Sequence, residues 1–177
     1  MSNWIQTFTN KKFAPLQPNI KDINIEDIAH ALSNKCRFSG HTKSFYSVAQ
    51  HSVLVSLICK PEDALWGLLH DASEGYLVDM PTPLKVLSEF KWFVEVENKL
   101  QKLIAVSFGL DEDQPESVHY ADKAMLLAEK RDLMPYCHED EWQIKYVGIE
   151  PYANIIKPLT PKQSEKEFLK RFKALKK

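Results

Sequence analysis

The chain has 177 residues, of which 44% are hydrophobic and 27% charged, and its formal net charge is −1. These totals are typical of one ordinary globular domain spanning residues 1–177. The count of 5 glycines argues against a turn-dense sandwich or barrel. The near-neutral charge argues against binding of duplex nucleic acid, because non-specific affinity for duplexes comes mainly from concentrated positive charge.

The sequence also carries signals of its compartment. Its three cysteines, Cys36, Cys59 and Cys137, are widely spaced and form no CxxC pair, so we expect free thiols in a reducing compartment. The first residues have no apolar signal core, and no apolar run approaches the ~20 residues that a membrane span needs. We therefore expect a cytoplasmic protein that does not enter a membrane.

The first elements in chain order are a small hairpin and a helix. Residues 4–16 carry β-prone side chains on both sides of a polar Thr-Asn-Lys-Lys patch, which favours a hairpin. Residues 24–34 place apolar side chains on one stripe behind Asn24, a residue type that caps helices, and so predict a helix. Residues 36–46 break this pattern and are expected to form a loop.

Two further helices are predicted between Ser47 and Glu74. Ser47 and Gln50 match a capping box, which predicts a helix from Ser47 to about Cys59. Pro61 with two acids behind it predicts the start of the next helix, since proline and acids are favoured in a first turn. That helix carries the segment LWGLLHDASE and ends before DMPTPL.

The second half of the chain is also predicted to be helical. Thr82-Pro83 starts a helix that continues to Gly109, with one apolar face. The segment SVHYADKAMLLAEKRDLM predicts a helix ended by Pro135, residues 135–159 are irregular, and Thr160-Pro161 starts a last helix whose basic side chains we interpret as a solvated face. Five to seven helices with at most one hairpin predict an all-α helical bundle. The face of the long helix comprises Phe93, Val96, Leu100, Leu103 and Ile104.

Four ionisable residues lie on three of these predicted helices: His51, His70, Asp71 and Asp122. Buried without partners, such groups cost several kcal/mol, so they must pair, stay at the surface or hold a metal. Two imidazoles and two carboxylates suit Mn²⁺, Fe²⁺, Co²⁺, Zn²⁺ or Mg²⁺, and no sulfur ligand favours zinc. The set predicts a site for one divalent metal ion of undecided identity.

The order His51, His70-Asp71, Asp122 resembles the HD-domain superfamily of metal-dependent phosphohydrolases. The segments YSVAQHS, LLHDASEGYLVDMPTPLK and YADKAMLLAEKRDL are similar to a bacterial and phage branch of that superfamily. This branch includes 5′-deoxynucleotidases, prophage YfdR-type hydrolases and phage dATP triphosphohydrolases. The resemblance covers about residues 1–135 and implies an HD-type bundle that self-associates into dimers or larger rings.

The resemblance also implies roles for individual residues. His51, His70, Asp71 and Asp122 correspond to the metal ligands, and Glu74 and Asp79 to an acidic pair beside the metal. Helical spacing by itself predicts Glu74 on the same face as His70 and Asp71. We take Glu74 as the candidate base, while Asp79 positions the water or protonates the leaving O5′, and the two assignments stay open.

Residues in contact with the substrate are expected around Arg37 and Phe38. They correspond to an Arg-Trp pair of the family that contacts phosphate and crowds the 2′ position of the sugar. A planar guanidinium suits phosphate, although a loop salt bridge and a core aromatic are the structural alternatives. The replacement of tryptophan leaves the rejection of ribonucleotides open. Further candidates are His41 and Lys85 in the pocket, and His119 and Glu129 behind the site, although ordinary partly exposed histidines and a surface lysine are the structural alternatives for the first three.

Three functions follow as expectations. The first is hydrolysis of deoxynucleoside 5′-monophosphates to deoxynucleoside and phosphate. The second is a dNTP triphosphohydrolase of the dATP type, which would cleave the same bond next to O5′. The third is a non-catalytic nucleotide-binding regulator on the same scaffold. In all three the expected partner is a small-molecule deoxynucleotide.

Overall fold

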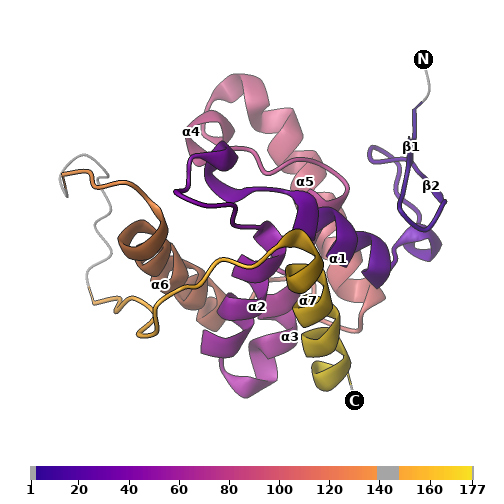
Figure 1. The fold of residues 1–177 in the computed structure, drawn as a ribbon. Coiled ribbons are helices and arrows are strands. Elements are labelled where there is room, and N and C mark those ends of the chain that lie inside the picture. The colour runs from indigo at the N-terminus through magenta and orange to yellow at the C-terminus, as the bar shows by residue number, and fades with distance from the viewer. Residues whose placement is uncertain (1–2, 139–147, 177) are drawn as a thin grey trace.

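Seven α-helices and one two-stranded antiparallel sheet form the part of the chain that the structure, a computed structural model, describes, residues 3–138 and 148–176 (Figure 1). The all-α class and the N-terminal hairpin are thereby confirmed. The elements are β1 (Ile5–Gln6), β2 (Lys12–Phe13), α1 (Ile25–Asn34), α2 (Val48–Ile58), α3 (Ala64–Leu69), α4 (Thr82–Lys85), α5 (Lys91–Ser107), α6 (Glu116–Leu133) and α7 (Pro161–Leu175).

The starts of α1 and α2 follow local capping signals, with one exception. The side chains of Asn24 and Ser47 each accept a backbone N–H in the first turn of α1 and α2, as their residue types predict. The expected reciprocal half of the box at Ser47 is wrong, because the side chain of Gln50 turns elsewhere. Its amide donates to the carbonyl of Lys157 at 2.8 Å and accepts from the N–H of Leu159 at 2.8 Å, which ties α2 to the segment before α7.

The helix expected from Pro61 through Glu74 is wrong in its second half. The α3 helix ends at Leu69, and a 3-10 turn, Ala72–Gly75, follows. The amide of Gln101, on α5, enters the break: it donates to the carbonyl of Leu69 at 2.7 Å and accepts from the N–H of Ser73 at 3.0 Å. In a continuous helix the carbonyl of Leu69 and the N–H of Ser73 would bond each other. Gln101 replaces this one helical hydrogen bond with two and keeps the two backbone groups apart.

The helix expected from Thr82 to Gly109 is divided in a similar way. A short α4 and a 3-10 turn, Ser88–Phe90, precede α5, and Gly109 ends this part with φ +79°, a conformation that favours glycine. The inner face of α5 carries Phe93, Glu97, Leu100 and Ile104, all buried. One of the residues in this apolar stripe is therefore an acid.

Two apolar clusters hold the helices together. The first joins α1, α2, α3 and α5 to α7, with Phe168 of α7 fully buried in it. The second joins α2, α3 and α5 to α6 around Trp66 and Met125. Although α7 comes last in the chain, it packs between α1 and α2 and is seen beside them in Figure 1. The site described below is built from elements that both clusters fix.

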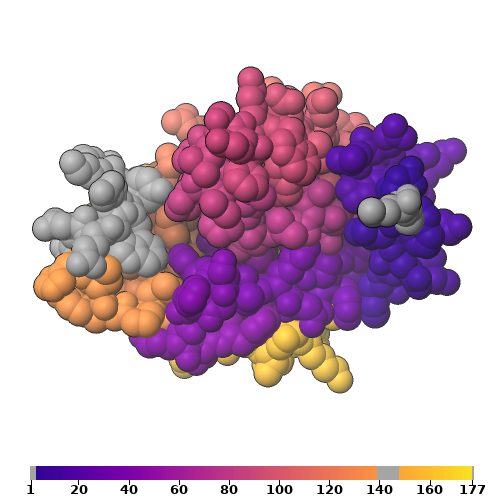
Figure 2. Space-filling view, turned by 90° about the horizontal axis from the view of Figure 1, so that it is seen from above, coloured from indigo at the N-terminus to yellow at the C-terminus, as the bar shows by residue number. Residues whose placement is uncertain are grey.

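The remaining segments lie at the periphery. Viewed from above, the hairpin and the end of α6 lie at opposite ends of the molecule, with the α4–α5 region between them (Figure 2). Residues 135–138 and 148–159 form no helix or strand, as predicted, and residues 139–147 lie outside the described part. All three cysteines are free thiols, as expected. Within the described ranges no helix combines the length and the apolar character needed to cross a membrane.

Candidate metal centre

The side chains of His51, His70, Asp71 and Asp122 converge on one point. The Nε2 atom of His51 lies 3.2 Å from Nε2 of His70, 3.7 Å from Oδ2 of Asp71 and 3.2 Å from Oδ1 of Asp122. The Nε2 atom of His70 lies 3.3 Å from the same Asp71 oxygen and 3.9 Å from the same Asp122 oxygen. Helices α2 and α6 and the break after α3 therefore bring four acceptor atoms together.

Both imidazoles are oriented from behind. The Nδ1 atom of His51 is 2.6 Å from Oε1 of Glu129, and Nδ1 of His70 is 2.8 Å from the carbonyl oxygen of Gly67. Both partners are acceptors, so each Nδ1 donates a proton, and each ring presents an Nε2 lone pair at the convergence point once that nitrogen is deprotonated. A second hydrogen bond of this kind is typical of histidines that bind metals.

The spacing of these atoms fits a divalent cation. Ligand atoms about 2.1 Å from such an ion lie about 3.0 Å apart at right angles and about 3.4 Å apart at tetrahedral angles. Without a cation or a proton between them, two lone pairs at 3.2 Å repel. The residues therefore can hold a metal ion, with His51, His70 and Asp71 as the tightest group and Asp122 within reach from the open side.

The charges around this point favour a cation. Burial and Arg37 lower the pKa of His51, but the carboxylates of Glu129 and Asp122 outweigh them and raise it to about 9. Burial would raise the pKa of Asp71, yet His70, His51 and Arg37 hold it far below its usual value. The histidines likewise lower the pKa of Asp122 to about 2, although partial desolvation acts in the opposite direction. Both aspartates are therefore ionised at neutral pH.

A buried ion pair supports the site from below. Glu129, on α6, has no exposed surface, and its Oε2 accepts a hydrogen bond from Nη2 of Arg37 at 3.0 Å. The other terminal nitrogen of Arg37 lies 3.6 Å from Oδ2 of Asp71. Burial would raise the pKa of Glu129, but Arg37 and His51 keep it below its usual value. The carboxylate of Glu129 thus links the guanidinium to a histidine of the centre.

The acidic pair expected beside the metal lines the same cavity. Glu74 lies in the 3-10 turn after the helix break, is 5% exposed, and its buried Oε2 has no hydrogen-bond partner in the described structure. Burial, and then repulsion from Asp71 and Asp79, raises the pKa of Glu74 well above its usual value. Burial is also the main cause that raises the pKa of Asp79. The pair thus holds its charge less readily than ordinary carboxylates do.

The loop that carries Arg37 has an unusual backbone. Phe38, Ser39 and Gly40 have φ angles of 54°, 51° and 82° in succession. A left-handed conformation is costly for a bulky residue such as Phe38 and marks backbone held by its surroundings. The turn lets both Arg37 and Phe38 line the cavity, with the guanidinium 5.5 Å from the centre of the phenyl ring.

A cavity of about 860 Å³ opens in front of the centre. Lys85 and His41 line it, as do Asp71 and Asp122 from the centre itself. His119 does not reach it: that ring is exposed, and its Nδ1 lies 3.3 Å from the side-chain nitrogen of Gln114. The apolar part of the wall is formed by Phe38, Met80, Pro81, Pro83, Leu126 and Met134.

Sequence reasoning missed two side chains that contact the site. Lys35 donates to the backbone carbonyls of Glu74 and Leu77 and so fixes the turn that carries the candidate base. Glu97, in the apolar stripe of α5, binds Lys85. Neither belongs to a recognisable motif. The only sequence signal for Glu97 is its helical phase, four residues after Phe93 and three before Leu100.

Fold and site together define an all-α helical protein with a His/Asp group that can hold a metal ion. No family model matches the sequence. The chain is 40% identical over 175 residues, 98% of its length, to the uncharacterized protein YfdR of Escherichia coli, of which it covers 96%. An uncharacterized protein of Rhodobacter capsulatus is 37% identical over 130 residues, which is 68% of this chain and 66% of that protein. The chain belongs to the YfdR family.

Proposed function

We propose that this protein is a metal-dependent phosphohydrolase that cleaves the 5′-phosphate ester of 2′-deoxynucleotides, releasing deoxynucleoside and phosphate from a dNMP. The observation that carries the proposal is the convergence of two imidazoles and two carboxylates at the wall of a cavity. The same cavity presents Arg37 and Lys85, whose cationic side chains suit a phosphate.

The residues of the centre would hold the ion, and the acidic pair would move protons. A bound dication neutralises phosphate oxygens and makes water a better nucleophile near neutral pH. Glu74 lines the cavity and would accept the proton of an attacking water, and its Oε2 has no hydrogen-bond partner in the described structure that would compete for that proton. Asp79 lies on the same cavity wall and would position that water or protonate the departing O5′. Raised pKa values make both acids stronger bases than ordinary carboxylates, which suits proton exchange with the substrate and water.

Charge balance favours a monophosphate over a triphosphate. The cavity wall carries four carboxylates, those of Asp71, Glu74, Asp79 and Asp122, and two permanently cationic side chains. A dication would cancel the net charge of these six side chains, but not that of the buried acids Glu129 and Glu97 next to them, and a phosphate monoester adds a charge of about −1.5 to −2. Both cations are already paired, Arg37 with Glu129 and Lys85 with Glu97. The described wall thus offers little positive charge to balance two further phosphates.

A substrate panel tests the proposal. The protein is incubated with dNMPs, dNTPs and ribonucleotides in the presence of Co²⁺, Mn²⁺ or Mg²⁺, and free phosphate, triphosphate and nucleoside are quantified. We expect phosphate from dNMPs. Intact triphosphate released from dNTPs would instead establish the triphosphohydrolase. Nucleotide binding without turnover under any metal would refute hydrolysis and favour a regulator.

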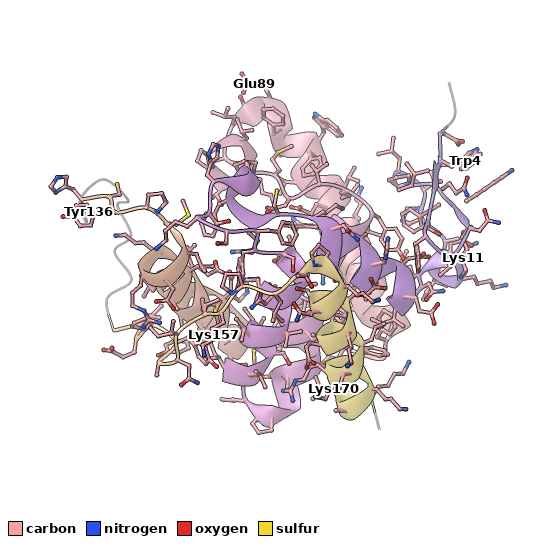
Figure 3. The ribbon with its side chains drawn as sticks, in the orientation of Figure 1. Trp4, Lys11, Glu89, Tyr136, Lys157 and Lys170 are labelled. Carbon is pink, nitrogen blue, oxygen red and sulfur yellow. The ribbon has the colours of Figure 1, made fainter. Side chains whose placement is uncertain are left out.

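Two variants calibrate this panel. Asp71→Asn should abolish turnover because it removes a charged ligand. The matched control is Glu89→Gln, since Glu89 is exposed on the α4–α5 connection, where Figure 3 shows it at the edge of the molecule, away from the centre. Equal activity of the two variants would remove Asp71 from the site.

A further inference from the structure

Lys85 lies between two buried acids. Its Nζ is 2.9 Å from Oε1 and 2.9 Å from Oε2 of Glu97, so both carboxylate oxygens engage the ammonium. The same Nζ is 3.9 Å from Oε1 of Glu74, too far for a hydrogen bond. The lysine is thus held beside one acid and kept apart from the other.

The position of Glu97 is unusual for a carboxylate. It is 8% exposed and occupies the apolar stripe of α5 between Phe93 and Leu100. A buried carboxylate is costly unless it is paired and hydrogen-bonded, and an apolar residue would suit this stripe better for stability alone. Within residues 3–138 and 148–176, Lys85 is the hydrogen-bonding partner of the Glu97 side chain. The placement indicates that the pair is present for its effect on the cavity, which Lys85 lines, and not for the stability of the apolar core.

Glu74 is the acid that competes for the lysine. Its Oε2 is buried without a hydrogen-bond partner, and its Oε1 faces the ammonium of Lys85 across 3.9 Å. A hydrogen bond to a cation stabilises the ionised form of a carboxylate and makes it a weaker base. If Lys85 moved to Glu74, the side chain that we propose as the base would therefore be occupied.

We propose that Glu97 is a positioning residue that holds the ammonium of Lys85 away from Glu74, so that the Glu74 carboxylate stays free to accept a proton. This inference rests on the proposed phosphohydrolase function for its catalytic consequence. The structural part of the inference, that Glu97 and Glu74 compete for Lys85, does not depend on turnover.

A double-mutant cycle tests the catalytic consequence. The variants Glu97→Gln, Lys85→Met and their combination are compared with the wild type for kcat and KM on the best dNMP. General bases contribute about 10²–10⁴-fold to rate, and partial occupation of Glu74 should therefore lower kcat of Glu97→Gln by about tenfold or more, with KM raised less than kcat falls. In the Lys85→Met background the same substitution should change kcat by less than about twofold. Equal losses in both backgrounds would overturn the proposal, as would unchanged kcat in Glu97→Gln.

A structural measurement separates this inference from the proposed function. In a crystal structure of the Glu97→Gln variant, Nζ of Lys85 should lie within hydrogen-bonding distance of Glu74. A lysine that remains beside the substituted side chain or turns to solvent would overturn the inference, whether or not the wild type hydrolyses a nucleotide. If Glu97→Gln folds poorly, Glu97→Leu, which matches the apolar stripe, provides the same comparison. A wild type without turnover would refute the proposed phosphohydrolase function, but the position of Lys85 in the Glu97→Gln structure would still decide this inference.

Discussion

The substitution Glu129→Gln tests how much the metal centre depends on a residue that is not itself a proposed ligand. Among the four proposed metal ligands Glu129 contacts His51, and it also accepts a hydrogen bond from Arg37. Glutamine keeps the volume of the side chain and one acceptor oxygen but loses the charge and the second acceptor. His51 and Arg37 must then share a single neutral acceptor, so the hydrogen bond that orients the His51 ring is weakened or lost.

The expected magnitudes follow from burial. Removing one partner of a buried ion pair costs about 3–5 kcal/mol, and we expect the lower end, about 3 kcal/mol, because Asp71 still lies 3.6 Å from Arg37. For a chain of 177 residues this corresponds to a melting temperature lower by about 6–12 °C. Loss of a carboxylate behind a metal-binding histidine lowers metal affinity about 10–100-fold.

The assay is a Co²⁺ titration followed by visible absorption, with thermal unfolding on the same samples. The matched control is Glu116→Gln, on the same helix but exposed, which should leave metal affinity unchanged and shift stability only slightly. A folded Glu129→Gln protein that binds Co²⁺ as tightly as the wild type would refute the reasoning, because His51 would then need no support from Glu129.

Four further predictions concern the ligands, the base, the helix contact and the pocket. Asp71→Asn should lose both bound Co²⁺ and turnover, whereas Glu74→Gln should keep the metal and lose about 10²-fold or more in kcat; a Glu74 variant at the wild-type rate would exclude it as the base. Gly67→Ala should lower the free energy of unfolding in urea by about 1–3 kcal/mol. An added Cβ would lie 2.5 Å from Sγ of Cys59 and 3.1 Å from the α2 backbone. An unchanged urea midpoint would contradict this close approach. Phe38→Trp should raise the ratio of dAMP to AMP turnover, since Phe38 lines the cavity; a constant ratio would show that residue 38 does not contact the sugar.

Features governed by neighbouring residues were predictable from the sequence. The cap at Asn24 involves a backbone N–H two residues away, and Thr160 and Gln163 form a complete capping box three residues apart. The break after Leu69 was not predictable, because its cause is Gln101, which lies 32 residues further along the chain. The segment LWGLLHDASE keeps helical periodicity across the break, so no local signal marks the end of α3.

The same division applies to the site. The residue types of the centre could be recognised because imidazoles and carboxylates on apolar helices need partners or a cation, and the structure brings His51, His70, Asp71 and Asp122 together. Among the polar groups around them, Glu129 could be proposed from its place on the same predicted helix as Asp122, but Lys35 and Glu97 could not be recognised. Glu97 is preceded by Glu95 and followed by Asn98 and Lys99, so it resembles any residue of a solvated helix face.

Only the rotation of α5 about its axis distinguishes Glu97 from these neighbours. That rotation is set by the packing of Leu100 and Ile104 into the first apolar cluster, and it turns Glu97 inward while Glu95, Asn98 and Lys99 remain exposed. A shift of one position, 100° on a helix, would expose Glu97 and release Lys85. The charge balance at the cavity therefore depends on apolar contacts along a helix that contributes none of the four residues of the centre.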